Sequence, residues 1–449
     1  MGKTNKKLFL FDEQYHIVFQ KSARFTETVD EDGYPCENLE SLRQSVFDSL
    51  KEVLLLEAFN IKAINFSAYG ASFVFINEQG NPLTPLYNYL KPFPEKFSEQ
   101  FYNSYGGQIK ISHQTASPVL GSLNSGLQLY RLKQEQPAIF KQLKYALHLP
   151  QYLSFLISGK MCSDITSIGC HTLLWDFKKQ QYHQWVHDER ILQKLAPIAH
   201  GEAASKIEYL QHHMQVGCGL HDSSAALIPY LLNFHEPFVL ISTGTWSISL
   251  NPFNTTPLTA AELMQDCLCY LSYKGIPVKA ARLFAGNEHE QQLKRIAAHF
   301  NQTPLYYRQA GFDIDILQKI KINETDTFDY SILKESVFAK RNLALFSTGA
   351  EAYHQLILDI VRQQCISTGL VIKDSSIRRI FVDGGFSNNA IFMNLLALHF
   401  PGVEVYAASM AQATAAGAAL AIHTAWNTKP IPGDIIELKY FSANHVSLI

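Results

Sequence analysis

The 449-residue chain lacks an excess of charge of either sign. It carries 38 Lys and Arg residues against 40 Asp and Glu residues, a formal net charge of −2. A protein that holds a nucleic-acid backbone or an anionic membrane surface needs a basic field, which this composition does not supply. We therefore expect a small-molecule partner, with no nucleic acid and no membrane among the partners.

A long hydrophobic run and a disulfide pattern are also lacking. Only residues 8–11 form an apolar run near the N-terminus, which is shorter than the core of a signal peptide. The seven cysteines are an odd number without a C-x-x-C pair, which suits neither a disulfide framework nor a zinc site. Cys267 and Cys269 are expected to be buried strand cysteines. These features predict a cytoplasmic protein without a metal site of its own.

What the chain has is a composition typical of a large folded protein. It is 47% hydrophobic and 17% charged, and its length predicts two or three domains. Strand-like and helix-like segments alternate, which indicates an α/β fold. In the first part of the chain the pattern predicts a hairpin of residues 7–11 and 15–19, a helix over 39–59, and strands over 61–66 and 72–77.

The spacing of apolar residues predicts helices between residues 124 and 158, with a break at Pro137. The pattern of a strand followed by a turn of small residues recurs at 238–242. We therefore expect a second α/β domain to begin there, which gives domains 1–237 and 238–449. The second domain is expected to continue with strands over 380–382 and 403–406 and a helix over 410–426.

Three glycine turns are candidates for binding phosphate. A turn of small residues after a strand leaves N–H groups unpaired, and glycine lets a phosphate approach them closely. Each turn alone is an ordinary structural element, but their recurrence in both halves favours a functional interpretation. They are Gly2-Lys3-Thr4-Asn5, Thr243-Gly244-Thr245 and Gly384-Gly385-Phe386-Ser387-Asn388.

Asp222 lies between a glycine-rich turn and a helix start, in the run Gly219-Leu220-His221-Asp222-Ser223-Ser224. Its position fits an N-cap equally well, because Asp is favoured there. His221 is by itself more typical of a packed histidine than of a catalytic one. The residues alone leave both alternatives open.

Together these segments resemble the FGGY family of carbohydrate kinases, and the resemblance covers nearly the whole chain. Order and spacing agree in both halves. The similar segments are 219–226 (GLHDSSAA), 241–247 (ISTGTWS) and 382–389 (VDGGFSNN), with 125–137 and 149–164 resembling the N-terminal domain signature.

The resemblance implies two ribonuclease-H-like, actin-like domains around a central cleft, with sugar held mainly by the first and ATP by the second. It implies phosphorylation of a sugar hydroxyl, with Asp222 as the general base and Mg²⁺ arriving with ATP. A homodimer is left open. By the resemblance, the ATP-binding residues are Gly2, Thr4, Gly244, Thr245, Gly384, Gly385 and Asn388.

The N-terminus departs from the family pattern, which opens with a strand and Asp-x-Gly. Without that strand we expect an open sheet edge and a depleted core. One explanation is a start about ten residues upstream; the other is a weakly catalytic relative. A non-catalytic sugar or nucleotide sensor on the same fold is therefore the alternative function.

The sugar side departs as well. Residues 87–91 (YNYLK) stand where relatives often show aromatic-x-Asp-x-Arg, and Lys is a poor substitute for the guanidinium fork. The segment 67–73 is most similar to rhamnulose kinases. Its Tyr69 and Ser72, with His221 and Asp222, are the candidate substrate-binding residues, although strand-end packing explains Tyr69 and Ser72 equally well. The substrate stays open among ketoses, deoxy-ketoses and polyols.

Overall fold

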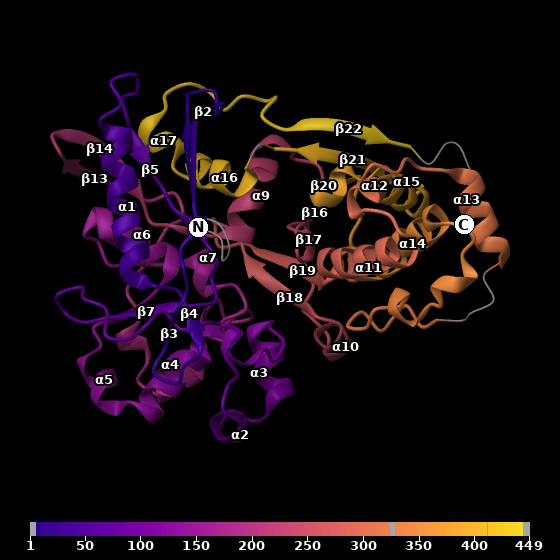
Figure 1. Ribbon diagram of the computed structural model, residues 1–449. Helices are drawn as coiled ribbons and strands as arrows, with labels where there is room; N and C mark the ends of the chain where they lie inside the picture. The colour runs from indigo at the N-terminus through magenta and orange to yellow at the C-terminus, as the bar shows by residue number, and fades with distance from the viewer. Residues whose placement is uncertain (1–5, 324–327, 411, 443–449) are drawn as a thin grey trace.

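The computed structural model describes residues 6–323, 328–410 and 412–442. Figure 1 shows an indigo-to-magenta half beside an orange half, with two helices between them, α9 (Asp222–Asn233) and α16 (Ala413–Ala421). These helices touch through their backbones, since a Cβ on Gly417 would lie 1.9 Å from the carbonyl oxygen of Ala225. Within the described ranges, no helix combines the length and the apolar character needed to cross a membrane.

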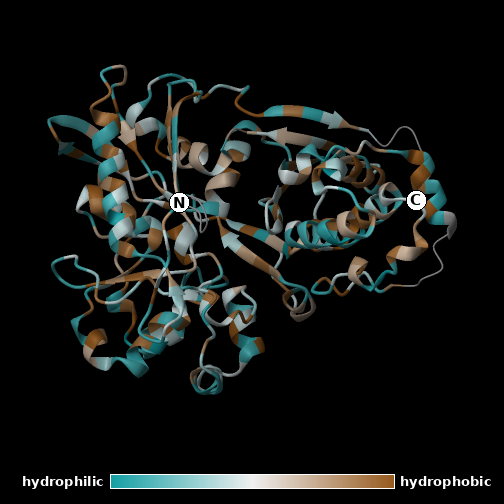
Figure 2. Ribbon diagram, in the orientation of Figure 1, coloured by the Kyte–Doolittle hydropathy of each residue, from teal (hydrophilic) through white to brown (hydrophobic). Residues whose placement is uncertain are grey.

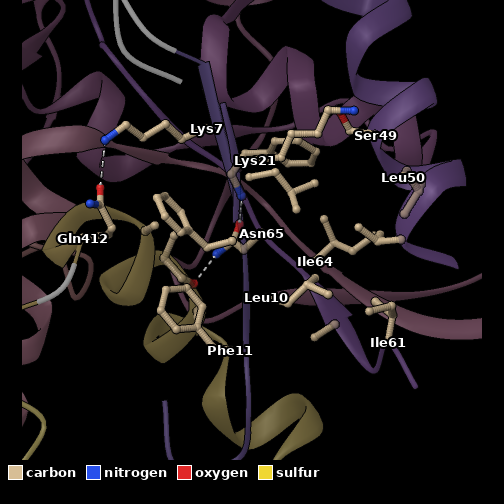
Figure 3. A pocket seen from close by; sticks show the side chains of 18 of the residues that line it. Lys7, Leu10, Phe11, Lys21, Ser49, Leu50, Ile61, Ile64, Asn65 and Gln412 are labelled. Carbon is tan, nitrogen blue, oxygen red and sulfur yellow. Dashed lines mark hydrogen bonds between the residues drawn. The ribbon is translucent and has the colours of Figure 1, made fainter. Parts of the chain in front are cut away.

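The strands of the N-terminal half form several small sheets. β1 pairs with β2 in an antiparallel hairpin, which lies beside α16 (Figure 3). β5 pairs in parallel with β14, and β6, which follows β5 in the chain, pairs in parallel with β15. The strands are β1 (Lys6–Phe11), β2 (Ile17–Ala23), β3 (Thr28–Val29), β4 (Pro35–Cys36), β5 (Ala63–Ile64), β6 (Ser67–Ala68), β7 (Phe73–Ile76), β8 (Tyr145–His148), β9 (Ser163–Asp164), β10 (Trp175–Asp176), β11 (Gln181–Tyr182), β12 (Ile198–Ala199), β13 (Ala204–Tyr209), β14 (His212–Gly217) and β15 (Leu220–His221).

The first long helix shows why the helices form where they do. Asn38 caps it by accepting a hydrogen bond from Ser41 N at 2.9 Å, and Leu42, Val46 and Leu50 recur at helical spacing on its buried face. The helices of this half are α1 (Leu39–Leu54), α2 (Glu95–Ser104), α3 (Gln108–Thr115), η1 (Gly121–Leu123), α4 (Ser125–Glu135), α5 (Pro137–Gln142), α6 (Leu149–Ser158), α7 (Ile165–Ile168), α8 (Gln184–Asp188) and η2 (Leu192–Lys194).

The helical prediction for residues 124–158 is wrong over one segment. Residues 145–148 form strand β8, antiparallel to β7, with Ala146 opposite Phe75. Three of its four side chains are buried, so apolar residues do not alternate with polar ones along the strand. A short apolar run of this kind cannot be distinguished from a helical turn by periodicity. The break at Pro137 is confirmed, because α5 begins at that residue.

The C-terminal half is built on one seven-stranded sheet in the order β18-β19-β17-β16-β20-β21-β22. β16, β20 and β21 are parallel neighbours, and the other pairs are antiparallel. The expected boundary at 237/238 stays a prediction, although the first strand of this sheet begins at Phe238. The strands are β16 (Phe238–Thr243), β17 (Ser247–Asn251), β18 (Cys267–Leu271), β19 (Pro277–Leu283), β20 (Arg379–Gly384), β21 (Glu404–Ser409) and β22 (Glu437–Phe441).

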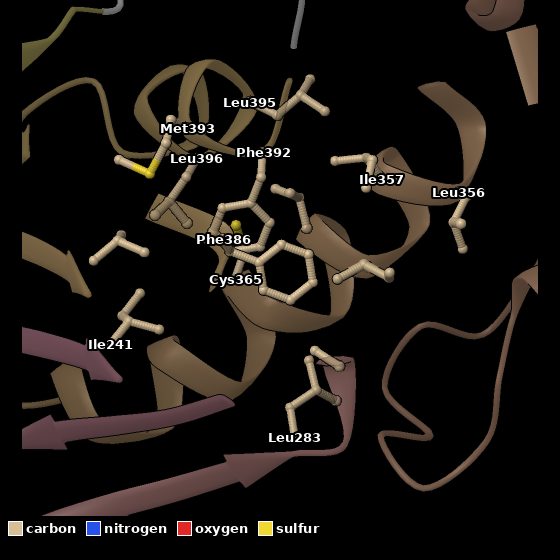
Figure 4. Packing of buried hydrophobic residues seen from close by; sticks show 14 of the residues in the cluster. Ile241, Leu283, Leu356, Ile357, Cys365, Phe386, Phe392, Met393, Leu395 and Leu396 are labelled. Atoms are coloured by element: carbon tan, nitrogen blue, oxygen red, sulfur yellow. The ribbon is translucent and has the colours of Figure 1, made fainter. Parts of the chain in front are cut away.

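Helices cover both faces of this sheet, so its central strands are apolar on both sides. Along β16, Val239 and Ile241 pack into the cluster with α14 and α15 (Figure 4), while Phe238 and Leu240 face α9 and α16. The outer helix α11 is mainly teal, hydrophilic, in Figure 2. The helices here are α10 (Ala260–Met264), α11 (Ala285–His299), α12 (Pro304–Arg308), α13 (Ile314–Asn323), η3 (Phe338–Lys340), η4 (Leu343–Leu345), α14 (Gly349–Ile372), η5 (Gly385–Asn388), α15 (Ala390–His399) and α17 (His423–Trp426).

The cysteines behave as the sequence predicts. All seven are free thiols, and Cys267 and Cys269 are buried on strand β18. The hairpin near the N-terminus is also confirmed, with its second strand shifted to Ile17–Ala23. Among the described strands, β1 pairs only with β2.

Candidate functional site

Asp222 is the first residue of α9, directly after the short strand β15. The N-cap position belongs to His221, so the alternative that Asp222 is the N-cap is wrong. Its Oδ1 accepts a hydrogen bond from Ser223 N at 2.7 Å, and the positive end of the helix dipole favours its negative charge. The side chain is 37% exposed and borders a cavity. Asp222 is therefore a charged, accessible carboxylate held at a fixed helix end.

The side chain of His221 contacts the carboxylate of Asp222. Its Nε2 lies 3.3 Å from Asp222 Oδ1, and its main-chain N–H donates to Thr166 Oγ1 at 2.9 Å. The ring is buried, and burial lowers the pKa of the imidazole even though the Asp222 charge raises it, so the ring is neutral near pH 7. Gly70 packs against this ring, where a Cβ would lie 2.6 Å from His221 Cδ2.

A buried cluster connects His221 with the C-terminal sheet. The ring of Tyr270 on β18 lies 5.4 Å from that of His221, and the ring of His171 lies 6.3 Å from Tyr270. Burial, and then the charge of Arg282, lower the pKa of His171 to about 3. Arg282 itself makes hydrogen bonds of 3.0 and 2.9 Å to the carboxylate of Asp266.

Sequence reasoning missed His171, Tyr270 and Arg282. Arg282 also stacks on Trp246, 5.2 Å from its ring centroid, directly after the turn at 244–245. Arg282 thus lies beside the turn at the end of β16, and its charge acts on the buried rings of His171 and Tyr270. Tyr270 lies on β18 and Arg282 on β19, and no sequence motif surrounds either residue. Only knowledge of which strands pair could have predicted that they lie near His221.

The two glycine turns of the C-terminal half lie side by side. β16 and β20 are parallel, and Thr243 is opposite Gly384 in their register. Thus Gly244 and Thr245 follow one strand, while the turn from Gly385 to Asn388 follows its neighbour. Gly244, Thr245, Gly384, Gly385 and Asn388 are all exposed. The carboxyl ends of parallel strands are the usual place for ligands in open α/β sheets.

The backbone at these turns leaves room for a ligand. Gly384 has φ of +91°, and a Cβ there would lie 1.9 Å from the carbonyl oxygen of Thr243. At Gly385 an added Cβ would meet no atom within 4 Å, so the space in front of the turn is open. Burial raises the pKa of Asp383, the residue before them, although the main-chain N–H of Gly384 stabilises its charge. Such a turn suits the close approach of a phosphate or ribose.

The hydroxyl groups of the predicted sugar-binding residues Tyr69 and Ser72 donate hydrogen bonds to other residues of the protein. Tyr69 is buried and donates to Glu37 Oε1 at 2.8 Å, and Glu37 in turn pairs with Lys6. The Ser72 hydroxyl is buried and donates to the carbonyl oxygen of Tyr87 at 3.1 Å. The ring of Tyr69 packs on Tyr89 at 5.4 Å.

Tyr89 is a further candidate that the sequence did not single out. Burial raises the pKa of its hydroxyl, and the charge of Asp222 raises it further. Tyr89 thus extends the aromatic surface that begins at Tyr69. Its signal in the sequence was the departure at 87–91, where an aromatic residue takes the place of a charged one.

The rest of the segment 87–91 is tied to the loop before it. Lys91 is buried and donates to Asp30 Oδ2 and Asp32 Oδ2, both at 2.6 Å. Asn88 donates to the carbonyl oxygen of Pro35 at 3.0 Å. Lys91 is thus committed to two carboxylates and does not stand in for a sugar-binding arginine.

The remaining predicted residues, Gly2 and Thr4, lie outside the described ranges. Among the described residues, Cys170, His171 and His221 bring potential metal-ligand atoms within 4.8 Å of one another. These offer sulfur and nitrogen, whereas Mg²⁺ prefers oxygen ligands. This cluster does not fit Mg²⁺.

The fold and these motifs match known carbohydrate kinases. Residues 1–223 match the N-terminal domain model of the FGGY family of carbohydrate kinases, and residues 235–310 match the C-terminal FGGY domain model. The rhamnulokinase of Halalkalibacterium halodurans is 23% identical over 264 residues, which is 55% of this chain and 54% of that protein. The chain therefore spans about half the length of the curated relatives it matches.

Solved structures agree on the architecture. A carbohydrate kinase from Novosphingobium aromaticivorans superimposes with a TM-score of 0.80 at 21% identity, covering 100% of this chain and 96% of that one. A ligand-bound xylulose kinase from Lactobacillus acidophilus gives a TM-score of 0.76 at 16% identity, covering 99% and 92%. The fold is thus the two-domain, actin-like α/β fold. The chain belongs to the FGGY family of carbohydrate kinases.

Proposed function

We propose that the protein is a cytoplasmic ATP-dependent sugar kinase in which Asp222 is the general base. The observation that carries this proposal is the position of Asp222, an accessible carboxylate at the N-terminus of α9 that borders a cavity. The seven free thiols support a reducing compartment. In this proposal the first domain, 1–237, holds the sugar and the second, 238–449, holds ATP.

The reaction is a phosphoryl transfer. A sugar hydroxyl gives its proton to the Asp222 carboxylate, its oxygen forms a bond to the γ-phosphorus of ATP, and the bond from that phosphorus to the bridging oxygen breaks, releasing ADP. His221, whose Nε2 lies 3.3 Å from Asp222 Oδ1, would keep the carboxylate oriented. Closure of the two domains over the reactants would exclude water.

On the nucleotide side, the open turns fit a phosphorylated ligand. The N–H groups of Gly244 and Thr245 are proposed to approach the phosphates, and Gly384, Gly385 and Asn388 to border the adenosine. Gly2 and Thr4, which lie outside the described residues, are proposed as further ATP-binding residues. Mg²⁺ would arrive with the phosphates and neutralise their charge.

On the sugar side, we propose a ketose, deoxy-ketose or polyol. His221 borders Asp222, and Tyr69 packs on Tyr89. Tyr69 and Ser72 support this aromatic surface through their hydrogen bonds to Glu37 and Tyr87. An aromatic wall next to polar groups is typical of sugar sites, because a ring covers the C–H face of the sugar.

The test is a substrate panel. The purified chain, both as it is and with a strand added in front of residue 1, is mixed with ATP, Mg²⁺ and each of a set of ketoses, deoxy-ketoses and polyols. We expect ADP and a sugar phosphate to appear in equal amounts with one class of sugar. Tight binding of ATP and sugar by both chains without any sugar phosphate would contradict the kinase and support the sensor.

A further inference from the structure

Three buried side chains that can bind a soft metal ion come together in the candidate site. They are those of Cys170, His171 and His221, whose sulfur and nitrogen ligand atoms all lie within 4.8 Å of one another. Thiolate sulfur and imidazole nitrogen are the ligands that Zn²⁺ prefers. His221 contacts Asp222, whereas Cys170 and His171 have no part in the proposed phosphoryl transfer. The cluster is therefore a second chemical feature of the same site.

Two segments that are far apart in the sequence form this cluster. Cys170 and His171 follow helix α7, and His221 is the last residue of β15. The main-chain N–H of His221 donates to Thr166 Oγ1 at 2.9 Å, which holds α7 beside β15. A Cβ on Gly70 would lie 2.6 Å from His221 Cδ2 and 3.2 Å from Cys170 Sγ, so a glycine is needed where the two side chains meet. No ligand-spacing motif joins these segments, which is why the sequence predicts no metal site.

The hydrogen bonds of the cluster leave ligand atoms for a cation. His171 Nδ1 lies 3.0 Å from the carbonyl oxygen of Leu123, which can only accept, so the neutral ring carries its proton on Nδ1 and a lone pair on Nε2. Zinc-binding histidines usually donate their other nitrogen in this way, because the hydrogen bond fixes the tautomer and the ring. Cys170 donates its thiol proton to the carbonyl oxygen of Ser167 at 3.1 Å. When the sulfur binds a cation, this proton passes to solvent.

The spacing of the three ligand atoms is close to that of a tetrahedral zinc site. Zn–S bonds are about 2.3 Å long and Zn–N bonds about 2.0–2.1 Å, so neighbouring ligand atoms lie about 3.3–3.6 Å apart. Atoms within 4.8 Å of one another reach this spacing when each side chain moves by about 1 Å toward their common centre. Three protein ligands leave the fourth position of the ion for water, as in accessible zinc sites.

The charges near the cluster suit a dication. A Cys170 thiolate supplies one negative charge, and the Asp222 carboxylate, 3.3 Å from His221 Nε2, supplies a second. Together they balance the charge of Zn²⁺, which a buried ion requires. Arg282, a positive charge near the cluster, is already paired with Asp266.

We propose that Cys170, His171 and His221 bind Zn²⁺, with water as the fourth ligand, and that the bound ion inhibits phosphoryl transfer. The ion enters from the cavity that Asp222 borders. Its charge attracts the Asp222 carboxylate, which is then less available to a sugar hydroxyl. The binding of zinc stands on the cluster alone, whereas the inhibition rests on the proposed kinase function.

The binding test uses Co²⁺ as a spectroscopic probe on the full chain, with its thiols reduced and without nucleotide. We expect one equivalent of Co²⁺ to produce the near-ultraviolet charge-transfer absorption of a cobalt–thiolate bond. Zn²⁺, which takes the same tetrahedral sulfur and nitrogen sites, should remove this absorption, and Mg²⁺ should not. No cobalt–thiolate absorption in the unchanged protein would overturn the proposal.

Two variants and a matched control assign the ligands. Cys170→Ser removes the sulfur, and His171→Asn keeps a donor for Leu123 while removing the Nε2 ligand. Each should weaken Zn²⁺ binding by at least about tenfold, in a protein whose thermal unfolding shows that it is folded. Cys162→Ser, which replaces a more exposed free thiol, should bind as the unchanged protein does. Binding that is lost in Cys162→Ser and kept in Cys170→Ser and His171→Asn would overturn the proposal.

The inhibition is measured as sugar-dependent ADP formation with Mg²⁺ and ATP in excess. Added Zn²⁺ should reduce turnover, a chelator should restore it, and Cys170→Ser should need at least about tenfold more Zn²⁺ for the same loss. Bound Zn²⁺ with unchanged turnover would overturn the inhibitory role. Absence of turnover in the zinc-free protein would count against the proposed kinase alone, because the cobalt measurement needs no turnover.

Discussion

Thr243 ties the two glycine turns of the C-terminal sheet together through Asp383. Its Oγ1 donates a hydrogen bond of 2.6 Å to the carbonyl oxygen of Asp383 and accepts one of 3.0 Å from Phe386 N. The residue that ends β16 thus holds the turn that follows β20. This hydroxyl group, together with the pairing of β16 and β20, sets the relative position of the proposed phosphate-side and adenosine-side turns.

Thr243→Val keeps the shape of the side chain and removes both hydrogen bonds. We expect the free energy of unfolding to fall by about 1–3 kcal/mol, because a buried carbonyl and a buried N–H lose their partner. The KM for ATP should rise more than the KM for the sugar. Thr243→Ser is the matched control and should keep both values near those of the unchanged protein. A valine variant with unchanged stability and unchanged KM for ATP would contradict this role.

Gly384 and Gly385 form a matched pair for a backbone test. Alanine at 384 has to adopt φ of +91° and to displace the Thr243 carbonyl, whereas alanine at 385 meets no atom within 4 Å. We expect Gly384→Ala to lower the free energy of unfolding by about 1–3 kcal/mol and Gly385→Ala to change it by less than about 0.5 kcal/mol. Chemical denaturation measures both, and equal losses would show that the turn is not held as described.

Lys91 is predicted to act on stability and not on sugar binding. Lys91→Met leaves the buried Asp30 without its partner, so the free energy of unfolding should fall by about 1–3 kcal/mol. The KM for the sugar should stay within twofold, since Lys91 is committed to Asp30 and Asp32. A large rise in KM with unchanged stability would place Lys91 in the sugar site instead.

His148 should make the protein less stable in mild acid. Burial is the main cause that lowers its pKa from 6.5 to about 3, so between these values the unfolded chain binds a proton that the folded chain does not. Stability conferred by the neutral ring is present above pH 6.5 and is lost as the pH falls below it. Between pH 7.5 and pH 5.5 this one group should lower the free energy of unfolding by about 1.4 kcal/mol.

The measurement is urea unfolding of the unchanged protein and of His148→Gln between pH 7.5 and 5.5. The glutamine side chain keeps a polar partner for Ser125, whose Oγ lies 2.9 Å from His148 Nε2. We expect the variant to lose about 1.4 kcal/mol less than the unchanged protein over this range. Identical pH dependence would show that His148 does not resist protonation in the folded state.

Much of the fold could be predicted from the sequence, because local patterns determine it. The hairpin at the N-terminus and the strand that starts at Phe238 are visible from their apolar residues and flanking turns. Strand β8 was not, since its burial removes the alternation that distinguishes a strand. Tyr270 and Arg282 were missed for a different reason: they approach the site only through pairing of strands far apart in the chain.

Asp222 was predicted from motif order, and its environment could not be. The sequence left open whether it is a helix cap, and the structure assigns the cap to His221 and exposes the carboxylate to a cavity. Tyr69 and Ser72 show the opposite case. Their hydroxyl groups are engaged with Glu37 and Tyr87, and no local pattern predicts such partners.

The most direct test of the account is the rate of sugar-dependent ADP formation by Asp222→Asn, in whichever of the unextended and strand-extended chains turns over faster. The amide keeps the size of the side chain but cannot accept the proton, so kcat should fall by about 10²–10⁴-fold. ATP affinity and thermal unfolding should stay unchanged, and Asp434→Asn, an exposed carboxylate elsewhere, should keep full activity. An Asp222→Asn protein with a kcat within twofold of the unchanged protein would contradict the central claim.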